Sequence, residues 1–141
     1  MKNIIIIISA SFITVTITLF IMYNVFLKDL LNNTNLTDNE CIKIIKNSNF
    51  YGFPDKKIGP YFNAFFSNPE WKCVRKPGKL YVIFQGDAYY FGKYVRFKIT
   101  FDVNKTIKTK TIQPISYYAG DEKILYTDFL NLINTIFMRT Q

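Results

Sequence analysis

The residues that could do redox or metal chemistry in this 141-residue chain are two cysteines, Cys41 and Cys73, and the sequence contains no histidine. Two thiolates without histidine cannot supply the four ligands of a closed zinc site within one chain, so we expect neither a metal nor another cofactor. In an oxidising compartment the two cysteines would form one disulfide. The alternative is a pair of buried thiols, because free cysteine packs as a small apolar side chain.

The sequence offers few side chains that could act in acid–base or nucleophilic catalysis. Without histidine the commonest general base is missing, and a serine or cysteine nucleophile lacks its usual partner. The sequence has no glycine-rich phosphate loop. Five of the ten carboxylates follow residue 71 and fall at expected turns and helix starts, where capping explains them; they are Asp87, Asp102, Asp121, Glu122 and Asp128. We therefore predict that the protein is not an enzyme.

Positive charge is concentrated between residues 72 and 110, where ten Lys or Arg and two acids carry a charge equal to the +8 of the whole chain. If a strand over 93–103 pairs with one over 106–115, four basic side chains would lie side by side. Such a patch attracts lipid headgroups, anionic wall polymers or an acidic protein partner. The alternative is a solvated face with lysines protecting a sheet edge. The four residues are Arg96, Lys98, Lys108 and Lys110.

Five tyrosines stand near basic residues in the same half of the chain. Tyrosine is favoured in contact surfaces because it brings a large area at a small entropy cost. The alternative is that these rings cover a sheet edge. Nucleic acid is not an expected partner, since no motif of the usual binding modules is present. The candidate contact aromatics are Tyr89, Tyr90, Tyr94, Tyr117 and Tyr118.

An uncharged stretch over residues 3–27 precedes these groups and is long enough to cross a bilayer as one helix. It is longer than the apolar core of a cleaved signal peptide and has no small-residue cleavage site at its end. We therefore predict an uncleaved single-pass signal-anchor over 1–28, a linker over 29–38 and an extracytoplasmic domain over 39–141. Lys2 favours a cytoplasmic N-terminus in the cell membrane, although the charge difference across the stretch is small.

Two helices are expected at the start of the domain. Thr37 and Glu40 have the spacing of a capping box, followed by a helix with Cys41 facing inward. A second helix begins near Ile58-Gly59-Pro60, because proline is tolerated in the first turn. One face of this helix carries Ile58, Phe62, Phe65 and Phe66.

The remaining pattern predicts four strands and a last helix. Strands are expected over 71–75, 80–85, 93–103 and 106–115, with an interruption near Gly86 and a type II turn at Pro77-Gly78. Apolar and polar residues alternate along 93–103, as in a half-buried strand. A helix opening at Gly120 would carry an apolar stripe over 124–137. The predicted fold is α+β in the order αα-ββββ-α, an antiparallel sheet with its helices on one face.

A series of motifs runs through residues 44–74 and continues into the expected second strand. It consists of Lys46-Asn47-Ser48, Pro54, Ile58-Gly59, Phe62, Phe65-Phe66, Asn68-Pro69-Glu70-Trp71, Val82, Phe84 and Gly86. With these motifs the chain resembles, over about 42–137, a small extracytoplasmic domain at the C-terminal end of bacterial single-pass membrane proteins, a family largely of unknown function. The resemblance implies a membrane-anchored topology and a small α+β fold, and it implies no catalytic residue.

These features predict a membrane-anchored accessory or binding protein whose domain docks a protein partner in an envelope, secretion or transport assembly. One alternative is a surface sensor that binds an anionic wall polymer, lipid headgroup or small ligand. Another is an exclusion- or immunity-type inhibitor of a second membrane protein.

Overall fold

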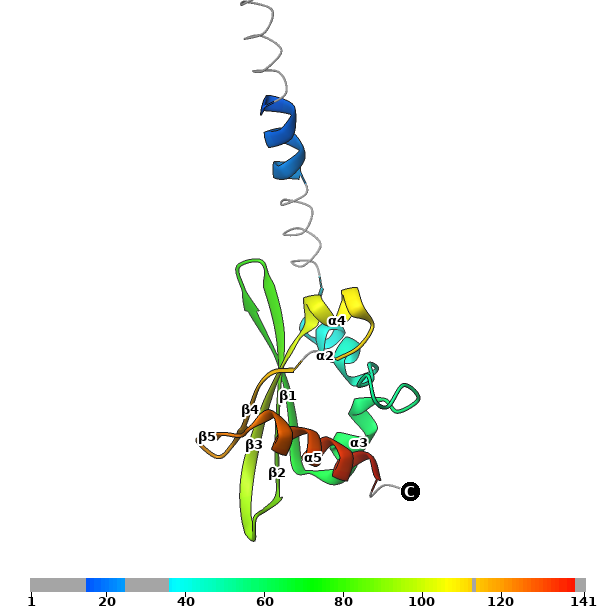
Figure 1. Ribbon diagram of the computed structural model, residues 1–141, viewed down its shortest axis with the longest axis vertical. Coiled ribbons are helices and arrows are strands. Elements are labelled where there is room, and N and C mark those ends of the chain that lie inside the picture. Colours follow the sequence, from blue (N-terminus) through cyan, green and yellow to red (C-terminus); the bar gives the residue numbers. More distant parts are fainter. Residues whose placement is uncertain (1–14, 25–35, 113, 139–141) are drawn as a thin grey trace, which may run out of the picture. The chain divides into compact units, whose positions relative to one another are not determined.

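A computed structural model of the protein describes residues 15–24, 36–112 and 114–138 (Figure 1). The chain divides into two compact units, Met1–Asn35 and Leu36–Gln141. Residues 15–24 of the first unit are helical. No helix among the described residues is both long and apolar enough to span a bilayer. The rest of the predicted anchor over 1–28 lies outside the described residues.

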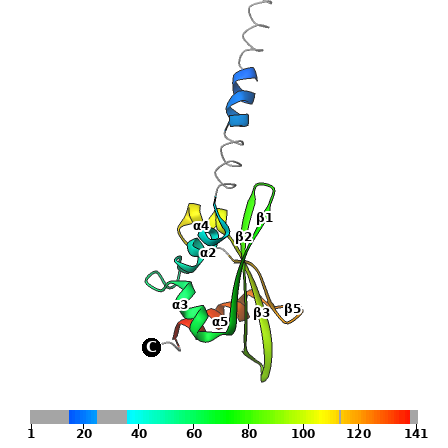
Figure 2. The ribbon, with the colours of Figure 1, turned by 180° about the vertical axis from the view of Figure 1, so that it is seen from behind.

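The described part of the second unit forms a five-stranded antiparallel sheet in the order β1-β2-β3-β4-β5. Helices α2, α3 and α5 lie on one side of this sheet in both ribbon views (Figures 1 and 2). This confirms the predicted α+β class. The elements are α2 (Asp38–Lys46), α3 (Ile58–Phe65), β1 (Ser67–Lys76), β2 (Lys79–Tyr90), β3 (Lys93–Asp102), α4 (Val103–Thr109), β4 (Pro114–Ala119), β5 (Glu122–Lys123) and α5 (Tyr126–Met138).

The two faces of the sheet differ in burial because side chains alternate along each strand. The face under the helices is apolar, and Val82 of β2 pairs there with Phe101 of β3. The helices contribute buried side chains to the same core, among them Ile45, Phe62 and Phe137. We call the other face the open face, because none of the described helices packs on it. It carries charged residues of three strands, among them Lys72 of β1, Asp87 of β2 and Lys98 of β3.

The predicted capping box at the start of α2 is confirmed. The Thr37 backbone N–H donates to Glu40 Oε2 at 2.7 Å, and the Glu40 N–H donates to Thr37 Oγ1 at 3.3 Å. Helix α3 then approaches α2 closely at Gly59, where a Cβ atom would lie 2.8 Å from Lys46 Cβ. The turn between β1 and β2 is also confirmed, with Gly78 at a φ of 67°.

The predicted strand over 106–115 is wrong, because residues 103–109 form helix α4. Asp102 caps this helix by accepting from the Lys105 N–H at 2.9 Å. The Asn104 amide joins the helix to the β1–β2 turn, since its Oδ1 accepts from the Leu80 N–H at 2.9 Å. The β-branched residues of this segment suggested a strand. Two of them, Val103 and Thr106, are instead buried on one side of a short helix.

Two further boundaries differ from expectation. Strand β2 continues through Gly86, which pairs with Phe97 of β3, so the predicted interruption is absent. The last helix begins at Tyr126 and not near Gly120. Gly120 has a φ of 62° and lies in the turn between β4 and β5, a short hairpin in which Ala119 pairs with Glu122.

Candidate partner-binding surface

The structure separates the four basic residues of the predicted patch. Arg96 and Lys98 lie on the open face of β3, whereas Lys108 is in α4 and Lys110 is the residue that caps its C-terminal end. Their expected alignment required a strand over 106–115, and that segment contains α4. The neighbour of β3 is instead β4, which places Tyr118 opposite Lys98.

Arg96 is engaged by two carboxylates. Its Nη2 lies 3.0 Å from Glu70 Oε1, and its Nη1 lies 3.2 Å from Asp87 Oδ1. The hydrogen bond from Asn68 Nδ2 and then the Arg96 guanidinium hold the pKa of Asp87 below its ordinary value. Arg96 therefore joins β1, β2 and β3 across the open face. Lys98 remains exposed beside this network.

A pocket of about 480 Å³ lies between the end of α2 and the end of α4. Its polar lining offers amide, hydroxyl and ammonium groups that could bind a small polar ligand. Both flanking helices have their C-terminal ends at this pocket, and the partial negative charge of a helix C-terminus favours cations. The ammonium group of Lys110 favours anions instead. The lining therefore has no clear preference for a cation or an anion. It consists of Ile44, Asn47, Ser48, Asn49, Thr106, Ile107 and Lys110.

The five candidate tyrosines divide into structural and exposed rings. Tyr117 stacks on Phe129 of α5, with ring centroids 4.4 Å apart and an interplanar angle of 14°. Tyr90 packs edge-on against Phe97, and burial raises the pKa of its hydroxyl. Tyr118 is half-buried on β4. The rings of Tyr117 and Tyr90 thus pack against the core.

Tyr89 and Tyr94 are exposed at the end of the β2–β3 hairpin. They face each other across the two strands, with ring centroids 5.4 Å apart. The loop between the strands consists of Phe91 and Gly92, with φ values of 47° and 77°. Two residues at positive φ define a type I′ hairpin turn. Phe91 is 84% exposed, Tyr89 76% and Tyr94 55%.

We call Tyr89, Phe91 and Tyr94 the aromatic tip. Phe91 is not among the five predicted contact aromatics, although its position before a glycine between two alternating strands is a hairpin signal. Asparagine is preferred where φ is positive, and a bulky side chain there is strained. The chain therefore holds a large apolar ring in solvent at a position where a small polar residue would fit the backbone better.

The two cysteines meet in the core. Cys41 of α2 and Cys73 of β1 both have buried thiols that belong to the hydrophobic core. Burial, and then the contact with Cys41, raises the pKa of the Cys73 thiol to about 12. The predicted disulfide remains a prediction. Among the described residues, no cluster of three or more His, Cys, Asp or Glu side chains could hold a metal ion.

Comparisons with known proteins gave no match: neither the models of protein families, nor the curated proteins, nor the solved structures contain a significant relative of this chain.

Proposed function

We propose that this protein is a non-enzymatic, single-pass membrane-anchored binding protein, whose extracytoplasmic domain docks a protein partner in an envelope, secretion or transport assembly. The anchor is the uncharged stretch over residues 3–27. The docking surface is the aromatic tip of the β2–β3 hairpin.

The observation that carries this proposal is the conformation and exposure of Phe91. A left-handed residue other than glycine or asparagine costs stability, and such strain is a reason to look for function. Phe91 combines that backbone conformation with an 84% exposed ring. Two further exposed rings, Tyr89 and Tyr94, flank it. Exposed aromatic side chains are the typical anchors of protein–protein interfaces.

The first experiment replaces Phe91 with a photoreactive phenylalanine analogue in intact cells. A protein partner at the aromatic tip should give a discrete crosslinked species, identified by mass spectrometry. The matched control places the same analogue at Tyr51, which is 92% exposed in a different turn. A crosslink at both positions, or at neither, would contradict a docking surface at the aromatic tip.

The second experiment separates binding from stability by using Phe91→Asn. Asparagine suits the positive φ, so we expect the domain to become more stable by up to about 1 kcal/mol. Recovery of the partner should nevertheless fall, because the ring is lost. Thermal unfolding and quantitative co-purification measure the two effects. Unchanged recovery of the partner would contradict the proposal.

The anchor is tested independently by extracting membranes with alkaline carbonate. An integral protein stays with the membrane pellet, whereas a peripheral protein is released. Release of the full chain would contradict the membrane anchor. It would not affect the crosslinking test of the docking surface at Phe91.

A further inference from the structure

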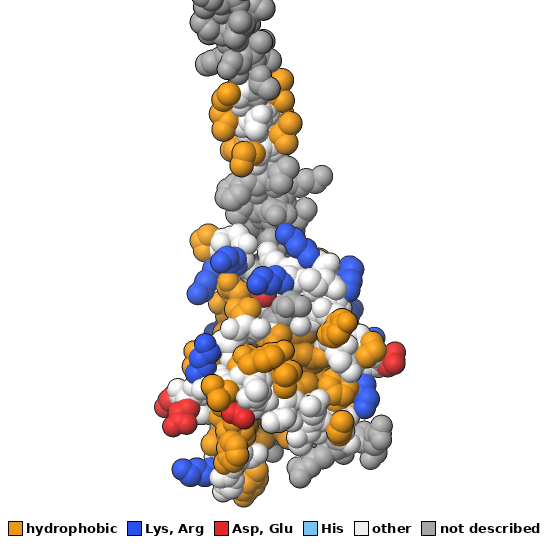
Figure 3. All heavy atoms as spheres, in the orientation of Figure 1, with side chains coloured by type: hydrophobic (Ala, Val, Ile, Leu, Met, Phe, Trp, Pro, Cys, Tyr) orange, Lys and Arg blue, Asp and Glu red, His pale blue; other side chains and the backbone are white. Residues whose placement is uncertain are grey.

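Four exposed lysines gather at one end of the domain, at the β1–β2 turn and on α4. Asn104 of α4 holds these two elements together, since its Oδ1 accepts from the Leu80 N–H at 2.9 Å and its Nδ2 donates to the Gly78 carbonyl at 3.5 Å. Lys and Arg side chains are concentrated at this end of the domain in Figure 3. We call the four lysines the basic end; they are Lys76, Lys79, Lys105 and Lys108.

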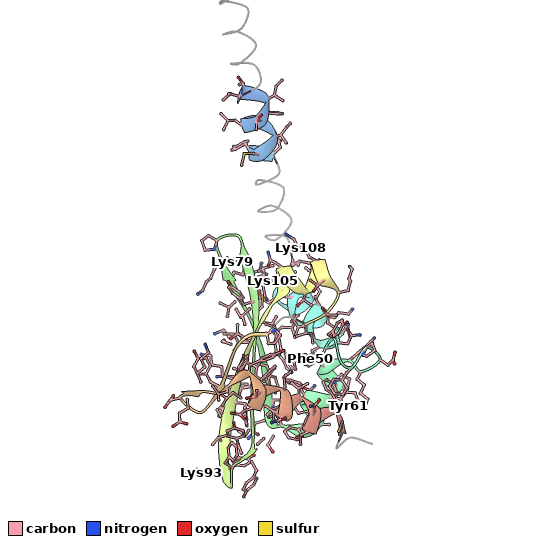
Figure 4. The ribbon with its side chains drawn as sticks, viewed as in Figure 1. Phe50, Tyr61, Lys79, Lys93, Lys105 and Lys108 are labelled. Carbon is pink, nitrogen blue, oxygen red and sulfur yellow. The ribbon has the colours of Figure 1, made fainter. Side chains whose placement is uncertain are left out.

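Figure 4 places Lys79, Lys105 and Lys108 together at this end, and Lys93 at the opposite end beside the aromatic tip. The two ends are joined by β2, whose 12 residues span about 36 Å at roughly 3.3 Å per residue. The domain therefore has a basic end and an aromatic end, separated by the length of the central hairpin.

The chain enters the domain at the basic end. Arg75, next to Lys76 in β1, donates from Nη2 to the Leu36 carbonyl and from Nε to Asp38 Oδ1 at 3.1 Å. Leu36 is the first residue of the second unit. Residues 29–35 separate it from the end of the predicted anchor, and these seven residues reach at most about 25 Å when fully extended.

The carboxylates at this end have local partners. Asp38 pairs with Arg75, with Nη2 and Oδ1 2.9 Å apart. Glu40 accepts from the Thr37 N–H in the capping box, and Asp102 caps α4. All four lysine side chains of the basic end are solvent-exposed.

We propose that the basic end lies against an anionic lipid surface. This inference rests on the membrane anchor of the proposed function, because the anchor makes a bilayer the nearest surface to Leu36. Where a bilayer carries anionic headgroups, its negative surface potential attracts exposed lysines that lie within about a Debye length of it. With the basic end on the bilayer, the β2–β3 hairpin projects the aromatic tip away from the membrane toward a partner.

The test uses the full chain in nanodiscs of phosphatidylcholine, with and without an equal part of phosphatidylglycerol. Lysines are acetylated with an amine-reactive ester and quantified by mass spectrometry. We expect acetylation of the basic end to fall roughly threefold or more in the anionic discs, and to recover in about 0.5 M salt. Lys93 and Lys98 serve as internal controls and should react equally in both discs.

Equal acetylation of the basic end in the two kinds of disc would overturn the inference while leaving the anchor intact. A chain that does not enter the discs at all would overturn the anchor as well, so the two failures are distinguishable. An equal decrease at Lys93 and Lys98 would also contradict the inference, because it would show protection without a preferred end.

A pair of charge-matched variants makes the test specific. The variant Lys79→Gln/Lys105→Gln/Lys108→Gln leaves Lys76 as the reporter at the basic end. The control Lys93→Gln/Lys98→Gln/Lys123→Gln removes the same charge elsewhere. Protection of Lys76 by phosphatidylglycerol should disappear in the first variant and persist in the second. The same protection in both variants would overturn the assignment, and circular dichroism confirms that each variant is folded.

Discussion

Cys73 is the residue whose chemistry the fold alters most. Burial, and then its contact with Cys41, raises the pKa of the Cys73 thiol to about 12 from an ordinary 9.0. The thiolate is the reactive form, so the folded protein should resist alkylation at neutral pH. Both thiols are buried in the same core.

A pH dependence follows from this pKa. The folded state favours the protonated thiol, so its contribution to stability is complete below pH 9 and is lost as the pH rises through about 12. We expect the unfolding free energy of the reduced protein to fall over this window. Other groups also titrate there, so the measurement is the difference in chemical denaturation between the wild type and Cys73→Ala. An identical decrease of the unfolding free energy at alkaline pH in the wild type and in Cys73→Ala would contradict the prediction.

The predicted disulfide is checked by the mass of protein prepared under oxidising conditions. A bond between Cys41 and Cys73 removes two hydrogen atoms and leaves no thiol that reacts after unfolding. Two reactive thiols in protein isolated from its own compartment would show that the pair is a reduced core contact.

At the scale of elements, Gly86 of β2 leaves room for Phe66, the residue that ends α3. A Cβ atom at this position would lie 2.7 Å from Phe66 Cβ and 2.8 Å from Phe84 Cζ. Phe66 directly follows α3, and its ring contacts those of Phe84 and Phe97. The glycine therefore lets the end of α3 pack onto the middle of a central strand.

We expect Gly86→Ala to destabilise the domain by about 1–3 kcal/mol, because the added methyl group must displace two buried rings. Thermal or urea unfolding measures the change. The matched control is Gly52→Ala, where a Cβ would meet nothing within 4 Å, and its effect should stay within about 0.5 kcal/mol. Equal stabilities of the two variants would show that the rings move without cost.

At the scale of the whole molecule, the core is closed within the second unit. Its buried apolar residues run from Cys41 to Phe137, and Leu36 packs against them as the first contributor. Helix α2 supplies two fully buried side chains, Cys41 and Ile45. A fragment over 36–141 thus retains every described core contact.

We predict that this fragment, without residues 1–35, unfolds in a single cooperative transition in urea. For about 100 residues, the unfolding free energy should decrease with urea concentration by roughly 1–3 kcal/mol per molar urea. A shorter fragment over 50–141 should fail to fold, since it lacks α2. A broad, non-cooperative transition for 36–141 would mean that the N-terminal segment contributes to folding.

Local signals in the sequence predicted the parts of the fold that form through short-range contacts. The Thr37–Glu40 capping box placed α2, the Pro77-Gly78 pair placed the β1–β2 turn, and alternation along 93–103 placed β3. Each signal depends on neighbours in the chain, through a side-chain cap, a required positive φ or a period of two. The α+β class followed from these elements and is confirmed.

Only the tertiary structure decided the segment after β3 and, with it, the candidate surfaces. Residues 103–109 are rich in β-branched side chains, yet the Asp102 cap and the bridge from Asn104 to the β1–β2 turn make them helical. That change separates Lys108 from Arg96 and places it at the same end of the domain as Lys79 (Figure 4). Which lysines share a surface, and which tyrosines stay exposed, depends on contacts between residues distant in the chain, and no local pattern encodes those contacts.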